Sequence, residues 1–113
     1  MGDTLFTKII NKEIPADIVY EDELCFAIKD IKPQAPVHLL LISRKPLDRL
    51  SNATPEDQAL LGHMLLAVGK ITRQLKIDDA FRLTVNNGAQ AGQSVFHLHM
   101  HILAGRPLRW PPG

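Results

Sequence analysis

The sequence has only one cysteine and no long apolar run, and each shortage excludes a class of protein. A single cysteine, Cys25, cannot form an internal disulfide, which fits a reducing compartment. No apolar stretch approaches the roughly 18 residues that a membrane-spanning helix needs. The first residues also lack the basic and apolar regions of a signal peptide. We therefore expect a cytoplasmic protein without membrane association.

Charge of one sign is also missing, since the formal net charge is only +1 and no basic or acidic run occurs. This balance gives no indication of nucleic-acid binding. A chain of 113 residues with 45% hydrophobic and 22% charged residues is typical of a globular protein. Because there are no repeats, low-complexity tracts or linkers, we expect one domain over residues 1–113.

Two helices are indicated by apolar residues at helical spacing. The first covers Leu5–Lys12, with Thr4 as N-cap. The second follows Thr54-Pro55-Glu56-Asp57, which supplies a capping residue, a proline at the first helical position and acids in the first turn. Its apolar stripe contains Leu60, Leu61, Met64, Leu65, Val68, Ile71 and Leu75. His63 lies roughly opposite this stripe, so we expect it to be exposed and inert.

Strands are expected where short apolar or alternating runs are bounded by turn residues. These runs cover residues 17–20, 24–29, 37–43, 81–86 and 96–103. The last two flank a loop and are expected to pair antiparallel. Together the elements predict an α+β fold, with an antiparallel sheet of about five strands, one long helix and one short N-terminal helix.

The final strand carries three histidines in strict alternation with apolar residues. Side chains of a strand point to opposite faces in turn, so His97, His99 and His101 share one face. The apolar residues between them then face the core. Solvent-facing strand positions seldom carry three histidines, and two chemical interpretations compete with a purely structural one. One is a metal site. The other is catalysis, because a neutral imidazole is a good nucleophile and proton carrier near neutral pH.

The loop before this strand favours the catalytic interpretation. It reads Asn86-Asn87-Gly88-Ala89-Gln90-Ala91-Gly92-Gln93-Ser94. Its small residues allow backbone N–H groups to approach an anion closely, and its amide and hydroxyl side chains add donors. A loop of this kind next to a histidine stripe predicts chemistry on phosphorus. Three histidines around one ion would be harder to arrange, because the outer two Cα atoms lie about 13 Å apart on a strand.

The segment His97-Leu98-His99-Met100-His101-Ile102-Leu103 also matches the histidine-triad motif, in which three histidines alternate with apolar residues. Other stretches resemble the same family in the same order, and together they span almost the whole chain: Glu13–Ala16, Asp30–His38, Leu61–His63 and Trp110–Gly113. The chain therefore resembles the histidine triad (HIT) superfamily, and within it the nucleotide-binding branch that hydrolyses adenosine phosphoramidates.

This resemblance implies roles for the histidines. His99 would be the nucleophile that carries a covalent nucleotide, and His97 would orient it and contact the phosphate. His101, with Ser94 nearby, would face the leaving group, and His38 would support the site from the adjacent strand. The resemblance also implies a homodimer whose two sheets join across a two-fold axis.

The same resemblance implies a nucleotide site. Asp30 would accept hydrogen bonds from the ribose hydroxyls, since a carboxylate offers paired acceptors. The apolar slot for the purine would consist of Leu5, Phe6, Ile9, Ile28 and Ile31. The α-phosphate would be held by Asn86, Gly92 and Gln93, beside Ser94, His99 and His101.

The predicted activity is hydrolysis of adenosine or guanosine 5′-phosphoramidates and related aminoacyl-adenylates through a nucleotidyl-histidine intermediate. Purine nucleoside monophosphates and their phosphoramidates are the expected ligands. We expect no cofactor and no metal, because the sequence has no group of carboxylates arranged for magnesium. Three alternatives remain: a dinucleoside polyphosphate hydrolase of the same superfamily, a nucleotide-binding module without catalysis, and a zinc-binding regulatory protein.

Overall fold

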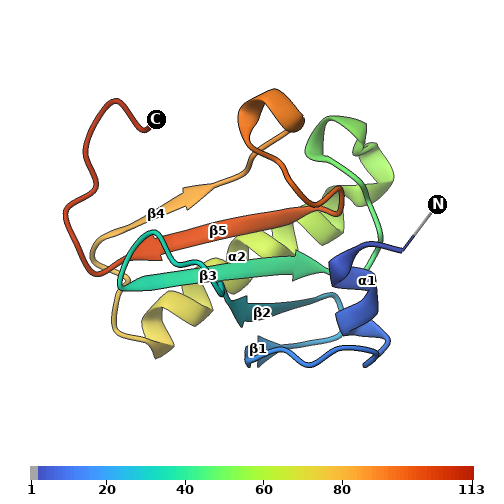
Figure 1. Ribbon diagram of the computed structural model, residues 1–113, viewed down its shortest axis with the longest axis horizontal. Coiled ribbons are helices and arrows are strands. Elements are labelled where there is room, and N and C mark those ends of the chain that lie inside the picture. The colour runs from blue at the N-terminus through green and yellow to red at the C-terminus, as the bar shows by residue number, and fades with distance from the viewer. Residues whose placement is uncertain (1–2) are drawn as a thin grey trace.

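Five strands pair into one antiparallel sheet in the computed structural model, which describes residues 3–113 (Figure 1). The strands are β1 (Ile18–Glu21), β2 (Cys25–Lys29), β3 (Val37–Ser43), β4 (Phe81–Thr84) and β5 (His99–Ala104). Their order in the sheet is β1-β2-β3-β5-β4. The predicted α+β class, the five strands and the antiparallel pairing of β4 with β5 are confirmed.

The register of β3, β4 and β5 decides which side chains share a face. His101 lies opposite Leu40 of β3 and Thr84 of β4, and His99 lies opposite Ile42. Residues directly opposite each other in antiparallel strands point to the same face. His99 and His101 therefore belong to one face, and the apolar residues between them belong to the other, as the alternation predicts.

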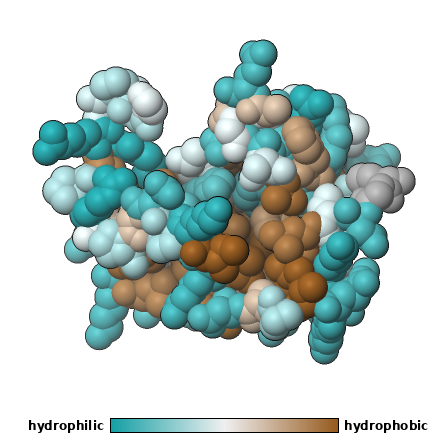
Figure 2. All heavy atoms as spheres, in the orientation of Figure 1, coloured by the Kyte–Doolittle hydropathy of each residue, from teal (hydrophilic) through white to brown (hydrophobic). Residues whose placement is uncertain are grey.

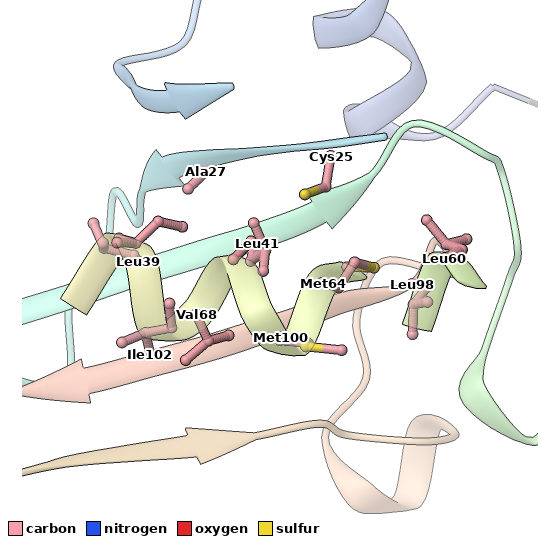
Figure 3. Close-up of a cluster of buried hydrophobic side chains, with 12 residues drawn as sticks. Cys25, Ala27, Leu39, Leu41, Leu60, Met64, Val68, Leu98, Met100 and Ile102 are labelled. Atoms are coloured by element: carbon pink, nitrogen blue, oxygen red, sulfur yellow. The ribbon is translucent and has the colours of Figure 1, made fainter. Parts of the chain in front are cut away.

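One face of the sheet is covered by the long helix α2 (Gln58–Gln74). The backbone N–H of Thr54 donates to Asp57, and the Thr54 side chain accepts from Glu56. These bonds cap a 3₁₀ turn, Pro55–Asp57, that precedes α2, so Thr54 and Pro55 lie one turn before the long helix that they were expected to begin. Figure 3 shows the core between this helix and the sheet. Its buried residues are Cys25, Ala27, Leu39, Leu41, Leu60, Met64, Ala67, Val68, Ile71, Leu98, Met100 and Ile102.

Two residues of the predicted helical stripe do not belong to this core. Leu65 is 55% exposed and Leu75 is 44% exposed. Leu65 directly follows the buried Met64, and one residue of an α-helix turns the side chain by about 100° away from the sheet. Leu75 lies just beyond the last residue of α2, where the chain leaves the core.

The other face of the sheet packs against the short helix α1 (Leu5–Ile10). Thr4 and Thr7 form a capping box at its first turn, as the N-cap prediction requires. A second apolar cluster fills the space between α1 and the sheet, and it consists of Phe6, Ile9, Phe26, Ile28, Leu40 and Ile42. This is also the face that carries His99 and His101.

Three elements are two residues shorter than the sequence predicts, and β2 begins one residue later than expected. Helix α1 ends at Ile10, since Lys12 adopts a positive φ of 60°. Strand β4 ends at Thr84, because the chain then turns toward Ser51, whose N–H donates to Asn87. Strand β5 begins at His99, since the N–H of Leu98 donates to the Leu47 carbonyl outside the sheet. Within residues 3–113, no helix combines the length and hydropathy needed to cross a membrane.

Candidate active site

A cavity of about 440 Å³ lies on the α1 side of the sheet and contains two of the three histidines of the motif. Figure 2 shows hydrophobic residues gathered beside α1 on this face. The predicted site residues that line the cavity are Leu5, Phe6, Ile9, Ile28, Asp30, Ile31, Ser94, His99 and His101. The structure thus brings the whole predicted purine slot together with the predicted nucleophile.

A backbone carbonyl fixes the tautomer of His99, that is, which ring nitrogen carries the hydrogen. Its Nδ1 lies 2.7 Å from the carbonyl oxygen of His97. A carbonyl can only accept, so Nδ1 must carry the hydrogen. In the neutral ring, Nε2 then keeps its lone pair. The edge of the Phe6 ring packs against His99, with ring centroids 4.9 Å apart. His99 is thus held in one orientation with a nucleophilic nitrogen left free.

A chain of hydrogen bonds fixes His101 in the opposite sense. The backbone N–H of Gln34 donates to Nδ1 of His38 at 3.0 Å, so Nε2 of His38 carries a hydrogen. That nitrogen lies 2.9 Å from Nδ1 of His101 and 3.4 Å from Oδ2 of Asp30. Nδ1 of His101 is then the acceptor, and its Nε2 carries the hydrogen. Nε2 of His101 is therefore a donor toward the cavity, whereas Nε2 of His99 offers a lone pair.

His97 does not line the cavity. Its ring is only 1% exposed, its Nε2 faces the Ser43 carbonyl, and its edge lies against Phe6. Its Nδ1 is buried without a hydrogen-bond partner among the described residues. The hydrogen bond between His97 and His99 is accepted by the His97 carbonyl and does not involve the His97 ring. The ring itself is too enclosed to meet a ligand in this conformation.

Burial favours the neutral form of all three rings. Desolvation lowers the pKa of His97 and of His99 below the ordinary value, because a charged imidazolium loses its hydration in the interior. Desolvation, together with the neighbouring rings of His99 and His38, lowers the pKa of His101 to about 4. Burial thus favours the neutral form of His99, in which Nε2 keeps its lone pair.

The loop before β5 is held by its own side chains. Gln93 is buried, accepts from the N–H of Gly88, and donates to the carbonyls of Asp48 and Val95. Gly92 adopts a left-handed φ of 95°, and a Cβ there would contact the Asn86 amide. Neither Asn86, Gly92 nor Gln93 lines the cavity. Ser94, the next residue, does line it.

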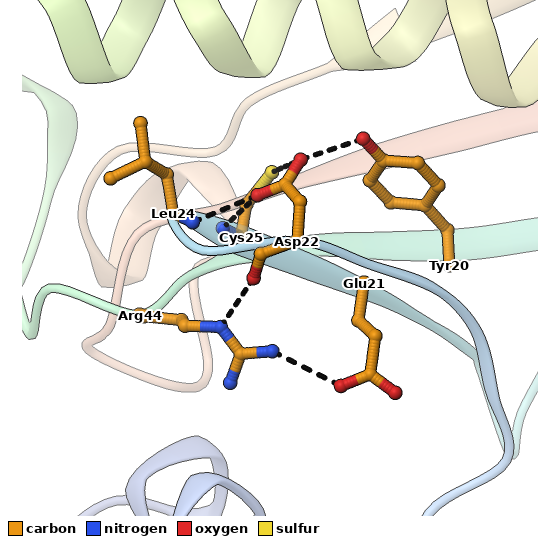
Figure 4. A network of polar contacts seen from close by, with 6 residues as sticks. All are labelled: Tyr20, Glu21, Asp22, Leu24, Cys25 and Arg44. Carbon is orange, nitrogen blue, oxygen red and sulfur yellow. Dashed lines mark hydrogen bonds and ion pairs between the residues drawn. The ribbon is translucent and has the colours of Figure 1, made fainter.

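A second polar cluster lies on the α2 side of the sheet, and sequence analysis missed it. Oδ2 of Asp22 lies 2.7 Å from Nε2 of His63 and accepts from the Tyr20 hydroxyl at 2.6 Å. Its Oδ1 accepts from the N–H groups of Leu24 and Cys25 (Figure 4). The His63 side chain is 39% exposed, as its position opposite the stripe predicts, but its ring contacts Asp22, which was not foreseen. The helical pattern around His63 could not predict this contact, because Asp22 lies 41 residues away in the sequence.

This cluster has pKa shifts of its own. Desolvation opposes ionisation of Asp22, but hydrogen bonds from Tyr20 and His63 hold its pKa well below the usual range. The hydrogen bond to Asp22 raises the pKa of Tyr20 to about 12. Desolvation raises the pKa of the Cys25 thiol to about 12, and the residue is fully buried. Cys25 is thus a core thiol, as its small apolar character predicts.

Two groups of side chains hold atoms of the kinds that ligate metals within 4.8 Å of one another. They are Asp22, Cys25 and His63, and Asp30, His38 and His101. In the second group, hydrogen bonds already occupy Nδ1 of His38 and Nδ1 of His101. In the first, His63 and Tyr20 both contact the same carboxylate oxygen. Each arrangement is thus explained by its hydrogen bonds.

Comparisons with known proteins agree with this geometry. The model of the HIT domain matches residues 11–108. A HIT-like protein from Synechocystis is 66% identical over 111 residues, covering 98% of this chain and 97% of its own length. A HIT family hydrolase from Legionella pneumophila has a TM-score of 0.95 and 39% identity, covering 98% of this chain and all of its own. A histidine triad nucleotide-binding protein from Candida albicans has a TM-score of 0.82 and 32% identity, covering 96% and 83%.

Proposed function

The chain belongs to the HIT domain family, and from this membership we propose that it hydrolyses purine nucleoside 5′-phosphoramidates and related aminoacyl-adenylates. One observation carries the proposal: Nε2 of His99 keeps its lone pair inside a cavity that also contains an apolar slot and a carboxylate. The related proteins described as a hydrolase and as a nucleotide-binding protein support the same reaction class.

We propose that the nucleoside binds with its base in the apolar slot beside α1. Phe6 and Ile9 are buried there, and Leu5 and Ile31 are exposed at the rim. Burying a flat purine against such residues is favourable by about 25 cal/mol per Å² of apolar surface removed from water. Asp30 lies at the end of this slot and can accept from both ribose hydroxyls.

In the proposed first step, Nε2 of His99 attacks the α-phosphorus. A bond from phosphorus to Nε2 forms, and the bond from phosphorus to the amine nitrogen breaks with its electron pair on the amine. The His99 ring becomes positively charged, and its Nδ1–H bond to the His97 carbonyl stabilises that charge. Ser94 and His101, which line the same cavity, would donate to the phosphoryl oxygens.

The departing amine needs a proton, and His101 is the proposed donor. Its own environment disfavours the charged ring, but the negative charge of a bound phosphoryl group opposes this effect. We propose that a proton taken up with the substrate goes to Nδ1 of His101 while the Nε2–H of His38 donates to Asp30 instead, and that His101 then delivers its Nε2 hydrogen to the amine. His38 and Asp30 would position the ring by the hydrogen-bond chain that starts at Gln34.

In the proposed second step, water attacks the phosphorus and the bond to His99 breaks. The water proton passes to Nε2 of His101 and then to solvent, so the neutral rings are restored. The products are a nucleoside monophosphate and a free amine. The loop residues Asn86, Gly92 and Gln93 are proposed to act by shaping the backbone that presents Ser94 and faces the phosphate.

The remaining expectations concern assembly and location. We propose a homodimer, for which the family resemblance is the support, and light scattering in solution would test it. We also propose a cytoplasmic location, which the free, buried Cys25 thiol supports because such a thiol suits a reducing compartment.

The proposed activity is tested by incubating the protein with adenosine 5′-phosphoramidate and measuring released adenosine monophosphate. The wild type should turn the substrate over, and His99→Ala should not. His63→Ala is the matched control, because it removes a histidine from the opposite face of the sheet. Tight binding of adenosine monophosphate without turnover by the wild type would favour a binding module instead.

A further inference from the structure

A second cavity, of about 410 Å³, follows the first along β5 on the same face of the sheet. His99 and His101 line the first cavity, and Leu103 lines the second. These three residues alternate along one strand, so their side chains point the same way. Thr84, which lies opposite His101, also lines the second cavity. The second cavity therefore begins beside the proposed proton donor.

Its walls carry positive charge without a matching acid. Three arginines line it, Arg82, Arg106 and Arg109, and no aspartate or glutamate does. None of the three forms an ion pair within residues 3–113. The whole chain has a formal net charge of only +1, so this concentration of cations is local. A pocket of this kind attracts an anionic group.

The pocket has a defined shape. Arg106 donates to the Gln34 carbonyl from Nε and Nη2, at 3.2 and 3.0 Å. Arg82 donates from Nη2 to the carbonyls of Leu108 and Arg109, which holds the C-terminal segment over the sheet. Figure 1 shows this segment rising at one end of β4 and β5. Hydrogen bonds rather than free loops thus form the walls.

A glycine turn directs the C-terminal segment into this position. Gly105 follows β5 with a φ of 94°, a conformation that favours glycine. A Cβ there would lie 2.8 Å from Pro36, which is closer than a real side chain allows. The tight passage places Arg106 directly after the turn, against the loop that contains Gln34.

Gln34 links this pocket to the proposed catalytic groups. Its N–H donates to His38, which contacts His101, while its carbonyl accepts from Arg106. The backbone of Gln34 thus bonds to Arg106 through its carbonyl and, through its N–H and His38, connects to His101. A group that leaves from the phosphorus next to His101 has the second cavity as its neighbour.

We propose that the leaving amine of the preferred substrate carries a carboxylate, and that Arg106 and Arg109 recognise it. This inference rests on the proposed function and adds the class of the leaving group. His101 and Leu103, which line the two neighbouring cavities, are about 6.6 Å apart along β5, so a carboxylate several bonds from the amine nitrogen would reach into the second cavity. An ω-amino acid of four carbons has this reach.

The experiment compares two substrates that differ only in charge. They are the adenosine 5′-phosphoramidates of 4-aminobutyrate and of 4-aminobutyramide. The wild type should hydrolyse the carboxylate with a kcat/KM about tenfold above that of the amide at low ionic strength, because partly exposed ion pairs contribute modestly and additively. Added salt should reduce the preference, since it screens the arginines.

Variants that remove single arginine charges show which residues recognise the carboxylate. Arg109→Gln and Arg106→Gln should each reduce the preference, and the double variant should treat both substrates alike. Arg73→Gln removes the same charge from α2 and should keep the full preference. Arg109→Lys should keep most of it. Turnover of the amide by Arg73→Gln should stay near that of the wild type.

The outcomes separate the two proposals. Equal kcat/KM for the two substrates in the wild type would overturn this inference and leave phosphoramidate hydrolysis intact. A preference that survives the double variant would also overturn it. Failure of the wild type to hydrolyse either substrate would overturn the proposed function, and this inference with it.

Discussion

Both faces of the sheet carry an aspartate paired with a histidine, but the pair beside α1 adjoins an apolar cavity of about 440 Å³, whereas His63 borders a smaller one of about 260 Å³. Asp30 lies 3.4 Å from His38, which continues to His101 at 2.9 Å. Asp22 lies 2.7 Å from His63, and its other oxygen is bonded to the backbone. On one face the same residue types form a hydrogen-bond chain that ends in ring nitrogens facing the cavity. On the other face, both carboxylate oxygens of Asp22 are already hydrogen-bonded within the protein.

The difference lies in what surrounds each pair. The α1 helix is short and leaves an apolar slot beside the histidines, whereas α2 covers its face with seventeen residues and fills it with side chains. A polar group next to a cavity can exchange its partners for a ligand. A carboxylate such as Asp22, whose oxygens are all hydrogen-bonded by the protein, stabilises the fold, because a donor or acceptor left unpaired lowers the free energy of unfolding.

The largest expected effect separates these two histidine groups. His99→Ala should reduce phosphoramidate turnover at least about a thousandfold, because loss of a nucleophile removes the covalent route. His63→Ala should leave turnover by the folded protein within about twofold of the wild type. Steady-state kinetics on both variants, with circular dichroism to verify folding, checks the contrast.

A smaller loss of turnover is expected within the relay. His101→Ala should reduce kcat about a hundredfold for a poorly leaving amine, since general acid catalysis contributes on this scale. A substrate with a leaving group that needs no proton should lose much less. An equal loss for both leaving groups would contradict the assignment of His101 as the donor.

The closed cluster should respond in stability instead of activity. Asp22→Asn removes a carboxylate that accepts from Tyr20, Leu24 and Cys25 and contacts His63, and should lower the free energy of unfolding by about 2 kcal/mol. Urea unfolding measures this loss. Turnover per folded molecule should be unchanged, and a large drop in kcat would show that the two faces are coupled.

Acid should affect the two clusters over different pH ranges. The pKa values of His97, His99 and His101 are lowered by burial, so the unfolded chain binds protons more readily than the folded one. Their contribution to stability is therefore lost as pH falls from about 6.5 toward the folded values. The pKa of Asp22 is also lowered, so its contribution persists above its ordinary value near 3.8 and is lost below it.

Unfolding measured from pH 7 down to pH 1.5 would distinguish these ranges. His101→Asn should reduce the loss of stability between pH 6.5 and about 4 and leave the loss at lower pH in place. Asp22→Asn should do the reverse. This is the smallest of the expected effects near neutral pH, because the rings are already neutral there.

Local patterns were sufficient to predict the fold. The Val37–Ser43 run is a strand with the predicted bounds, and Thr54 caps the 3₁₀ turn Pro55–Asp57 that leads into the long helix. The alternation at 97–103 also correctly assigns His99 and Met100 to opposite faces, because strand geometry alone decides this.

Contacts between distant residues were not predictable in the same way. The burial of His97 depends on the Ser43 carbonyl, 54 residues away, and on Phe6 from the first helix. Gln93 looked like an anion ligand by composition, but its side chain bonds to the carbonyl of Asp48, 45 residues away. No local spacing encodes such partners, since they are set by how the loops meet.

The most direct test of the account is to trap the covalent intermediate. The protein is mixed with adenosine 5′-phosphoramidate, quenched in denaturant within the first turnover, digested and examined by mass spectrometry. The account predicts an adenylate on the peptide that contains His99, located on that residue and missing from His99→Ala. Full turnover by His99→Ala, or an adenylate located on another residue, would contradict it.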